Sequence, residues 1–183
     1  MMANSGMTKI FAEILDRQVK LPTTGHITTE RLYRAFTIGP KLNKAERQLL
    51  LKSPILRYEC VNVINRINQE IKVQLEKSQI QMAIIPLAAA NESSEYHFSA
   101  RDFDVYLYDK SNSAMPWIVF LQLSAKVTNC LYPLTRIRLY DSGGLDWIIG
   151  KPDKNGQIIG EWLDNETNLV ERSKLYSLHI EPI

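Results

Sequence analysis

The spacing of hydrophobic residues changes along the chain, and the change predicts where helices give way to strands. From residue 7 to about residue 77, apolar residues recur every three or four positions, the period of an amphipathic helix. After residue 80 they alternate with polar residues or form short runs between turns, as in strands. We therefore expect an α+β fold in which N-terminal helices (1–77) pack on a C-terminal antiparallel β-sheet or meander (78–183), the whole chain 1–183 forming a single domain.

Four helices are expected in the first 77 residues. An apolar stripe predicts the first over Met7–Val19, and the second, at about 29–37, ends before Gly39-Pro40. Asn43, with an acid three residues later at Glu46, predicts a capping box at the start of a helix over 43–51.

The longest predicted helix covers about 54–77. Ser53-Pro54 supplies a cap residue followed by a proline at the first helical position. Its apolar stripe spans about 22 residues, or about 33 Å of helix. The stripe consists of Leu56, Cys60, Val63, Ile64, Ile67, Ile71 and Leu75. We expect this face to be buried and Cys60 to be a core residue.

The second half of the chain predicts short strands separated by turns. They are Ile80–Leu87, Phe103–Tyr108, the very apolar and central Trp117–Val127, Thr135–Tyr140, Leu145–Ile149, Ile158–Leu163 and Leu175–Ile180. Asp153-Lys154-Asn155-Gly156 carries the Asn-Gly signal of a tight hairpin. Because the connections are too short for crossover helices, successive strands are expected to pair antiparallel. The glycines of this half are interpreted as turn residues.

Composition fits an ordinary globular protein, with 45% hydrophobic and 23% charged residues among 183. The sequence shows no signal-peptide pattern and no apolar run of about 18 residues that would span a membrane. Its two cysteines do not suggest a disulfide framework. We expect a cytoplasmic or otherwise intracellular protein that is not secreted.

Charge is divided unevenly, although the net charge is only +2. Residues 1–77 contain 13 Lys and Arg against 7 Asp and Glu, whereas residues 78–183 contain 9 against 13. This asymmetry indicates either an anionic partner for the first half or head-to-tail contact between copies of the chain. The alternative is that the excess cations are simply solvated on helix surfaces.

Two groups of residues are candidates for binding a polyanion, either nucleic acid or an anionic membrane surface. Arg136, Arg138 and Tyr140 share one face of a predicted strand, where arginine and an aromatic ring can hold phosphates and stack bases. The alternative for this face is pairing of the arginines with acids on neighbouring strands, such as Asp146 or Glu161. The second group lies in the basic helical half and comprises Arg31, Arg34 and Lys44.

Familiar catalytic signatures are missing, so the sequence predicts no catalytic residue, metal ligand or cofactor. One arrangement suggests an alternative. Asp102 and Asp104 begin one predicted strand, and Gln122 and Lys126 follow on the next, as acids and a lysine do in metal-dependent nucleases. The second acid is replaced here by Gln122, and Lys126 comes two residues late.

We therefore expect a non-catalytic structural or interaction protein that self-associates and binds a polyanionic partner. A small viral matrix-type or accessory protein, or a bacterial adaptor, would have such a design. The alternative is a metal-dependent enzyme that processes nucleic acid, with Asp102, Asp104, Gln122 and Lys126 near the metal. Sequence alone does not rank a third possibility, a small-molecule site between helices and sheet.

Overall fold

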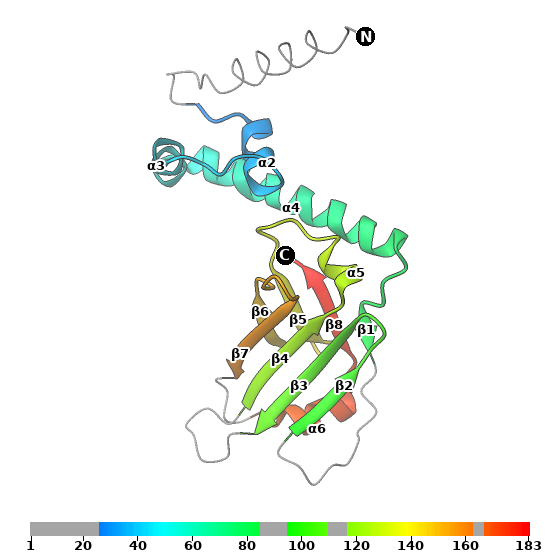
Figure 1. Cartoon of the computed structure of the whole chain (residues 1–183). Coiled ribbons are helices and arrows are strands. Elements are labelled where there is room, and N and C mark those ends of the chain that lie inside the picture. The colour runs from blue at the N-terminus through cyan, green and yellow to red at the C-terminus, as the bar shows by residue number, and fades with distance from the viewer. Residues whose placement is uncertain (1–25, 85–94, 110–116, 163–166) are drawn as a thin grey trace, which may run out of the picture.

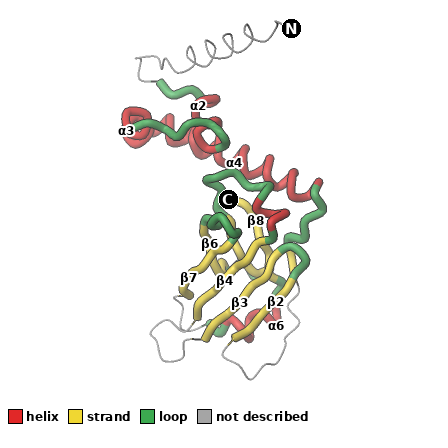
Figure 2. Tube along the Cα trace, in the orientation of Figure 1, coloured by secondary structure: helices red, strands yellow, loops and turns green. Residues whose placement is uncertain are grey.

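The computed structural model describes residues 26–84, 95–109, 117–162 and 167–183. It confirms the α+β class, with helices first and antiparallel strands after them. Figures 1 and 2 show the described N-terminal helices gathered at one end of the strands, which lie in two layers. The predicted helix over Met7–Val19 lies outside the described residues.

The three N-terminal helices follow the sequence pattern closely. They are α2 (Thr29–Phe36), α3 (Lys44–Lys52) and α4 (Pro54–Lys77). The side chain of Asn43 accepts from the backbone N–H of Glu46, and the Glu46 carboxylate accepts from the backbone N–H of Asn43. The predicted capping box is therefore confirmed. Ser53 caps α4, whose Pro54 takes the first helical position.

The long helix α4 joins the helical region to the strands. All residues of the predicted stripe are buried except Ile64, which is half-buried. The buried stripe residues belong to one hydrophobic core that also contains residues of both sheets. Near its C-terminal end, Lys72 forms an ion pair with Glu181 in the last strand, at 3.2 Å. The helices and the sheets are thus held by a continuous apolar core with an ion pair at its margin.

The strands form two four-stranded sheets in which every neighbouring pair is antiparallel. The first sheet, in spatial order, consists of β1 (Ala83–Ile84), β8 (Leu178–Pro182), β5 (Ile137–Asp141) and β6 (Asp146–Gly150). The second consists of β2 (Glu95–Ser99), β3 (Phe103–Asp109), β4 (Trp117–Leu123) and β7 (Gln157–Trp162). Alternate residues of both sheets are buried against each other, which makes a sandwich (Figure 1).

The prediction of a hairpin at Asp153–Gly156 is correct for the turn and wrong for the pairing. Gly156 adopts a φ of 79° and its N–H donates to the carbonyl of Asp153. The turn, however, carries the chain from β6 in one sheet to β7 in the other, so the flanking strands do not pair. A Cβ on Gly160 would lie 2.8 Å from Ile148 Cδ1. This strand glycine, interpreted from sequence as a turn residue, instead lets β6 and β7 approach.

Several boundaries in the strand region differ from those predicted. The strand from Trp117 ends at Leu123 and not at Val127, because the hydroxyl of Ser124 accepts from the N–H of Val127 and caps a short helix, α5 (Ala125–Thr128). The last strand, predicted from Leu175, begins at Leu178 because Leu175 ends helix α6 (Leu169–Leu175). Strand β2 and helix α6 were not predicted. Of the predicted strand Ile80–Leu87, Ala83 and Ile84 form β1, and residues 85–87 lie outside the described residues.

A buried ion pair attaches α6 to the first sheet. Asp141, fully buried at the end of β5, accepts from Arg172 of α6 through both carboxylate oxygens. The indole N–H of Trp147 donates to the same carboxylate at 2.9 Å, and the backbone N–H of Leu145 at 3.1 Å. Burial alone would raise the pKa of Asp141, but these donors outweigh it and the pKa lies below its ordinary value.

Replacing Asp141 with alanine is expected to lower the free energy of unfolding by about 3 kcal/mol, because Arg172 and Trp147 would lose their acceptor. Lys174→Ala removes an ion pair with Glu171 on the same helix, but both side chains are exposed, so a change below about 0.5 kcal/mol is expected. Urea unfolding of the two variants measures both values. Equal losses would show that the Asp141 pair does not hold α6.

Candidate functional site

Several basic residues lie together at one end of the sandwich because of the directions in which the strands run. Because neighbours run antiparallel, β3, β5 and β7 begin where β4 and β6 end, as the partners Phe103–Leu123, Gln122–Gln157 and Ile137–Gly150 show. Five of the nine Lys and Arg residues of 78–183 lie at or just outside these strand ends. We call this group the basic end: Arg101, Lys126, Arg136, Lys151 and Lys154.

Four of these cations are exposed and are not held in ion pairs with other described residues: Lys126, Arg136, Lys151 and Lys154. Arg101 differs, since its Nε donates to Asp102 at 2.9 Å and its Nη2 to the carbonyl of Gln79. The four side chains therefore present positive charge to solvent at one end of the molecule.

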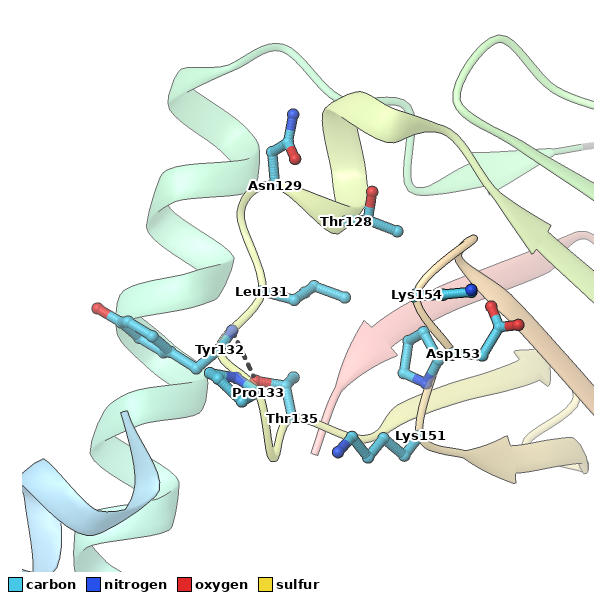
Figure 3. Close-up of a pocket in the computed structure, with 10 residues that line it drawn as sticks. Thr128, Asn129, Leu131, Tyr132, Pro133, Thr135, Lys151, Asp153 and Lys154 are labelled. Carbon is cyan, nitrogen blue, oxygen red and sulfur yellow. Dashed lines mark hydrogen bonds between the residues drawn. The ribbon is translucent and has the colours of Figure 1, made fainter. Parts of the chain in front are cut away.

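An open hollow of about 630 Å³ lies at the basic end. Its two sides are the loop that follows α5, with Thr128, Leu131 and Thr135, and the turn between β6 and β7, with Lys151 and Lys154. Figure 3 shows Leu131 reaching from the loop toward the turn, while Tyr132 points away toward α4. Apolar and hydroxyl groups thus line one side and lysines the other.

The acid beside these lysines serves the turn itself. Oδ1 of Asp153 accepts from the backbone N–H groups of Asn155 and Gln157, both at 2.8 Å. These bonds direct this oxygen into the backbone of the turn, as in an Asx turn. Lys151 and Lys154 do not form an ion pair with this carboxylate.

A second hollow, of about 410 Å³, adjoins the first and shares Thr128 and Lys154 with it. It is lined by three of the residues considered for a nuclease-like site, Asp102, Asp104 and Gln122. Asp104 and Gln122 are direct partners across β3 and β4, so the predicted adjacency of these strands is correct. Lys126, the fourth, follows β4 on the exposed side of α5.

The two aspartates of this group are engaged by protein donors. Asp102 is buried and accepts from the backbone N–H of Gln81 at 2.7 Å and from Arg101. The bond from Gln81 is the main cause of a pKa of Asp102 below its usual value. Asp104 accepts from Ser99 Oγ at 2.6 Å and lies 3.2 Å from Nε2 of His97. No group of three or more His, Cys, Asp or Glu suited to a metal ion occurs among the described residues.

Of the predicted sheet-face residues, the structure separates Arg136 from the other two. Arg138 pairs with Asp146 and, at 3.1 Å, with Glu181, and its guanidinium lies 4.6 Å from the centre of the Tyr140 ring. The pairing with Asp146 that the sequence left open as an alternative is therefore present. Arg136 lies just before β5, exposed, at the basic end.

The three predicted residues of the helical half also have different surroundings. Arg31 makes two hydrogen bonds to the Glu46 carboxylate, at 2.8 and 2.9 Å, and two more to the carbonyls of Pro40 and Lys41. It fixes the connection between α2 and α3, so a variant at Arg31 would report folding as well as binding. Arg34 and Lys44 are exposed on α2 and α3.

Sequence reasoning missed Lys151 and Lys154 as site residues. The signal was available, because both flank the Asn-Gly turn and the antiparallel pattern places the residue after β6 beside the residue before β5. What the pattern did not show is that this turn passes from one sheet to the other. That crossing places the two lysines opposite the loop after α5 and forms the hollow.

Comparisons of the chain with models of protein families, with curated proteins and with solved structures found no match. In the described part of the chain, none of the helices combines the length and the apolar character needed to cross a membrane.

Because the pKa values of Asp102 and Asp141 are lowered, the free energy of unfolding is expected to decrease at acidic pH. Each carboxylate stabilises the folded state fully above its unfolded pKa of about 3.9, and this contribution is lost as pH falls below that value. Asp102→Asn keeps an oxygen for the Gln81 N–H but cannot titrate. The variant is therefore expected to lose less free energy of unfolding than the wild type between about pH 6 and about pH 3. Urea unfolding measures this, and equal losses would contradict the prediction.

Proposed function

We propose that the protein is a non-catalytic interaction protein that self-associates and binds a phosphate-bearing polyanion at the basic end. The observation that carries the binding proposal is the hollow lined by Lys151 and Lys154, with Arg136 beside its wall residue Thr135. These cations form no ion pair with other described residues and are available to a ligand, whereas Arg138 and Arg31 are already paired with acids.

The chemistry of the hollow suits an extended polyanion better than a small enclosed ligand. Lysines act as point charges for phosphate, and the hollow is open to solvent. A chain of phosphates passing Lys151 and Lys154 would follow the two hollows that share Lys154. Such binding releases counterions and weakens steeply with salt.

Self-association is supported by apolar side chains left exposed on the helices. Leu51, Ile55 and Tyr58 retain 73, 72 and 69% of their accessible surface. Clusters of large exposed apolar residues are characteristic of surfaces that contact another molecule.

The binding proposal is tested by replacing Arg136, Lys151 and Lys154 together with glutamine. Affinity for a labelled single-stranded RNA is expected to fall at least tenfold, and the slope of log affinity against log salt to flatten by about 2, since each lost phosphate contact on a single strand removes about 0.7. Fluorescence anisotropy at several salt concentrations measures both. Vesicles with and without phosphatidylserine distinguish an anionic surface from nucleic acid.

The matched control removes three cations from α3, Lys44, Arg47 and Lys52, at low protein concentration. This variant is expected to bind RNA as the wild type does. If it loses binding while the variant of the basic end retains it, the helical half is the binding surface and the hollow is not.

The same mixtures test the metal-dependent alternative. One observation favours this alternative: Asp104 and Gln122 are partners on neighbouring strands and line the same hollow as Lys154. RNA and DNA that stay intact with Mg²⁺ or Mn²⁺ would count against nuclease activity. Cleavage that Asp104→Asn abolishes would replace the non-catalytic proposal.

A further inference from the structure

Apolar side chains and lysines both line the first hollow at the basic end. Leu131 and Pro133 come from the loop after α5. Pro152 comes from the turn between β6 and β7, and it follows Lys151 two positions before Lys154. In Figure 3 Leu131 reaches from the loop toward this turn. The hollow therefore offers apolar surface and positive charge to the same ligand.

The two lysines extend in different directions. In Figure 3 the side chain of Lys151 runs toward the loop, below Leu131, whereas the side chain of Lys154 points away from the loop. Lys154 also lines the second hollow, and Lys151 is not among the residues that line it. A ligand that contacts both lysines therefore carries anionic groups on two sides of the part that lies against Leu131.

Both walls of the hollow are fixed by hydrogen bonds of the protein itself. The N–H of Thr135 donates to the carbonyl of Tyr132 at 3.0 Å, and the N–H of Tyr132 donates to the Thr135 hydroxyl at 3.2 Å. The N–H of Leu131 donates to the carbonyl of Thr128 at 3.1 Å. The turn is closed by its own bonds around Asp153. A site that is already in place before the ligand arrives loses less conformational entropy on binding.

One carboxylate, that of Asp153, lies among the described residues that line this hollow. Its Oδ1 accepts from the backbone N–H groups of Asn155 and Gln157 and is thereby directed into the turn. Lys151 and Lys154 outnumber this acid. The lining of the hollow therefore favours an anionic ligand overall.

We infer that the polyanion is a single-stranded nucleic acid, one base of which lies between Leu131 and Pro152. The phosphates on the two sides of that nucleotide contact Lys151 and Lys154. The hollow of about 630 Å³ is large enough for one nucleotide, since pockets for small organic ligands measure about 300–1,000 Å³. The inference rests on the proposed binding at the basic end and names the class of ligand.

Insertion of a base selects a single strand over other polyanions. In a duplex the bases are paired and stacked, whereas the bases of a single strand can be splayed out into a protein. Inorganic polyphosphate and anionic lipid headgroups carry phosphate without a base. Charge alone gives the opposite order, because a duplex carries more phosphates per unit length than a single strand. The relative affinities of a single strand and a duplex therefore separate base insertion from attraction by charge.

The ligand side of the contact is tested on the full wild-type chain. A labelled single-stranded RNA of about twelve nucleotides, within the usual site size of such proteins, is compared with the same strand made abasic and with the matching duplex. Fluorescence anisotropy at one salt concentration measures the three affinities. The single strand is expected to bind about fivefold more tightly, or better, than either of the others, because both lack the base contact. Unlabelled inorganic polyphosphate is expected to compete no better than the abasic strand.

The protein side is tested with Leu131→Ala. This variant is expected to bind the single strand about fivefold more weakly and the abasic strand as the wild type does, because apolar contact is lost and the lysines remain. The matched control is Leu134→Ala, in the same loop and 40% exposed but not among the residues that line the hollow. It is expected to bind both strands as the wild type does. Thermal melting checks folding, and if Leu131→Ala does not fold, the three affinities of the wild type decide the inference.

The outcomes separate this inference from the proposed function. Wild type that binds none of these ligands and no vesicles overturns both. If the duplex or the abasic strand binds as tightly as the single strand, only base insertion is overturned, and the basic end remains a general site for polyanions. Binding confined to vesicles that contain phosphatidylserine assigns the basic end to a membrane surface and overturns the inference. A folded Leu131→Ala variant with an unchanged preference for the single strand also overturns it.

Discussion

The burial of alternate side chains between two antiparallel sheets is the constraint on which the rest of this structure depends. Once Val105, Val119 and Leu139 must point inward, the residues between them must point outward, and the register of every strand is set. A shift by one residue would expose the core and bury Tyr106 and Arg138. The composition of the outer face of each sheet is therefore a consequence of the same packing requirement.

Antiparallel pairing also decides where the connecting residues lie. Each strand begins at one end of the sandwich and finishes at the other, so cations that are distant in sequence but adjoin strand ends, such as Arg101 and Lys151, lie at the same end. The division of charge between the two halves of the sequence did not predict this basic surface. The second half is acidic overall, yet it contributes the basic end, because several of its acids are engaged within the fold: Asp141 is buried, and Asp146 and Glu181 pair with Arg138.

Position alone did not separate the arginines and lysines that hold the fold from those available to a ligand. Arg31, Arg138 and Arg172 each pair with a carboxylate from another element. These contacts stabilise the folded chain. Lys151 and Lys154 lie in a turn whose acid, Asp153, is bound by backbone N–H groups. Whether a cation is paired or available depends on the neighbours that the tertiary structure places beside it. A guanidinium forms hydrogen bonds to a carboxylate that the fold brings within reach.

The sequence by itself determined the three helices from Thr29 to Lys77, their caps at Asn43 and Ser53, and the alternating strands, because these depend on contacts within a few residues. It also determined the turn at Asn155-Gly156, which needs positive φ. Only the tertiary structure decided that this turn joins two sheets, that Ser124 ends the apolar strand, and that α6 is held by Asp141. Those outcomes depend on which distant segment becomes a neighbour, and local patterns do not encode a partner far away in the chain.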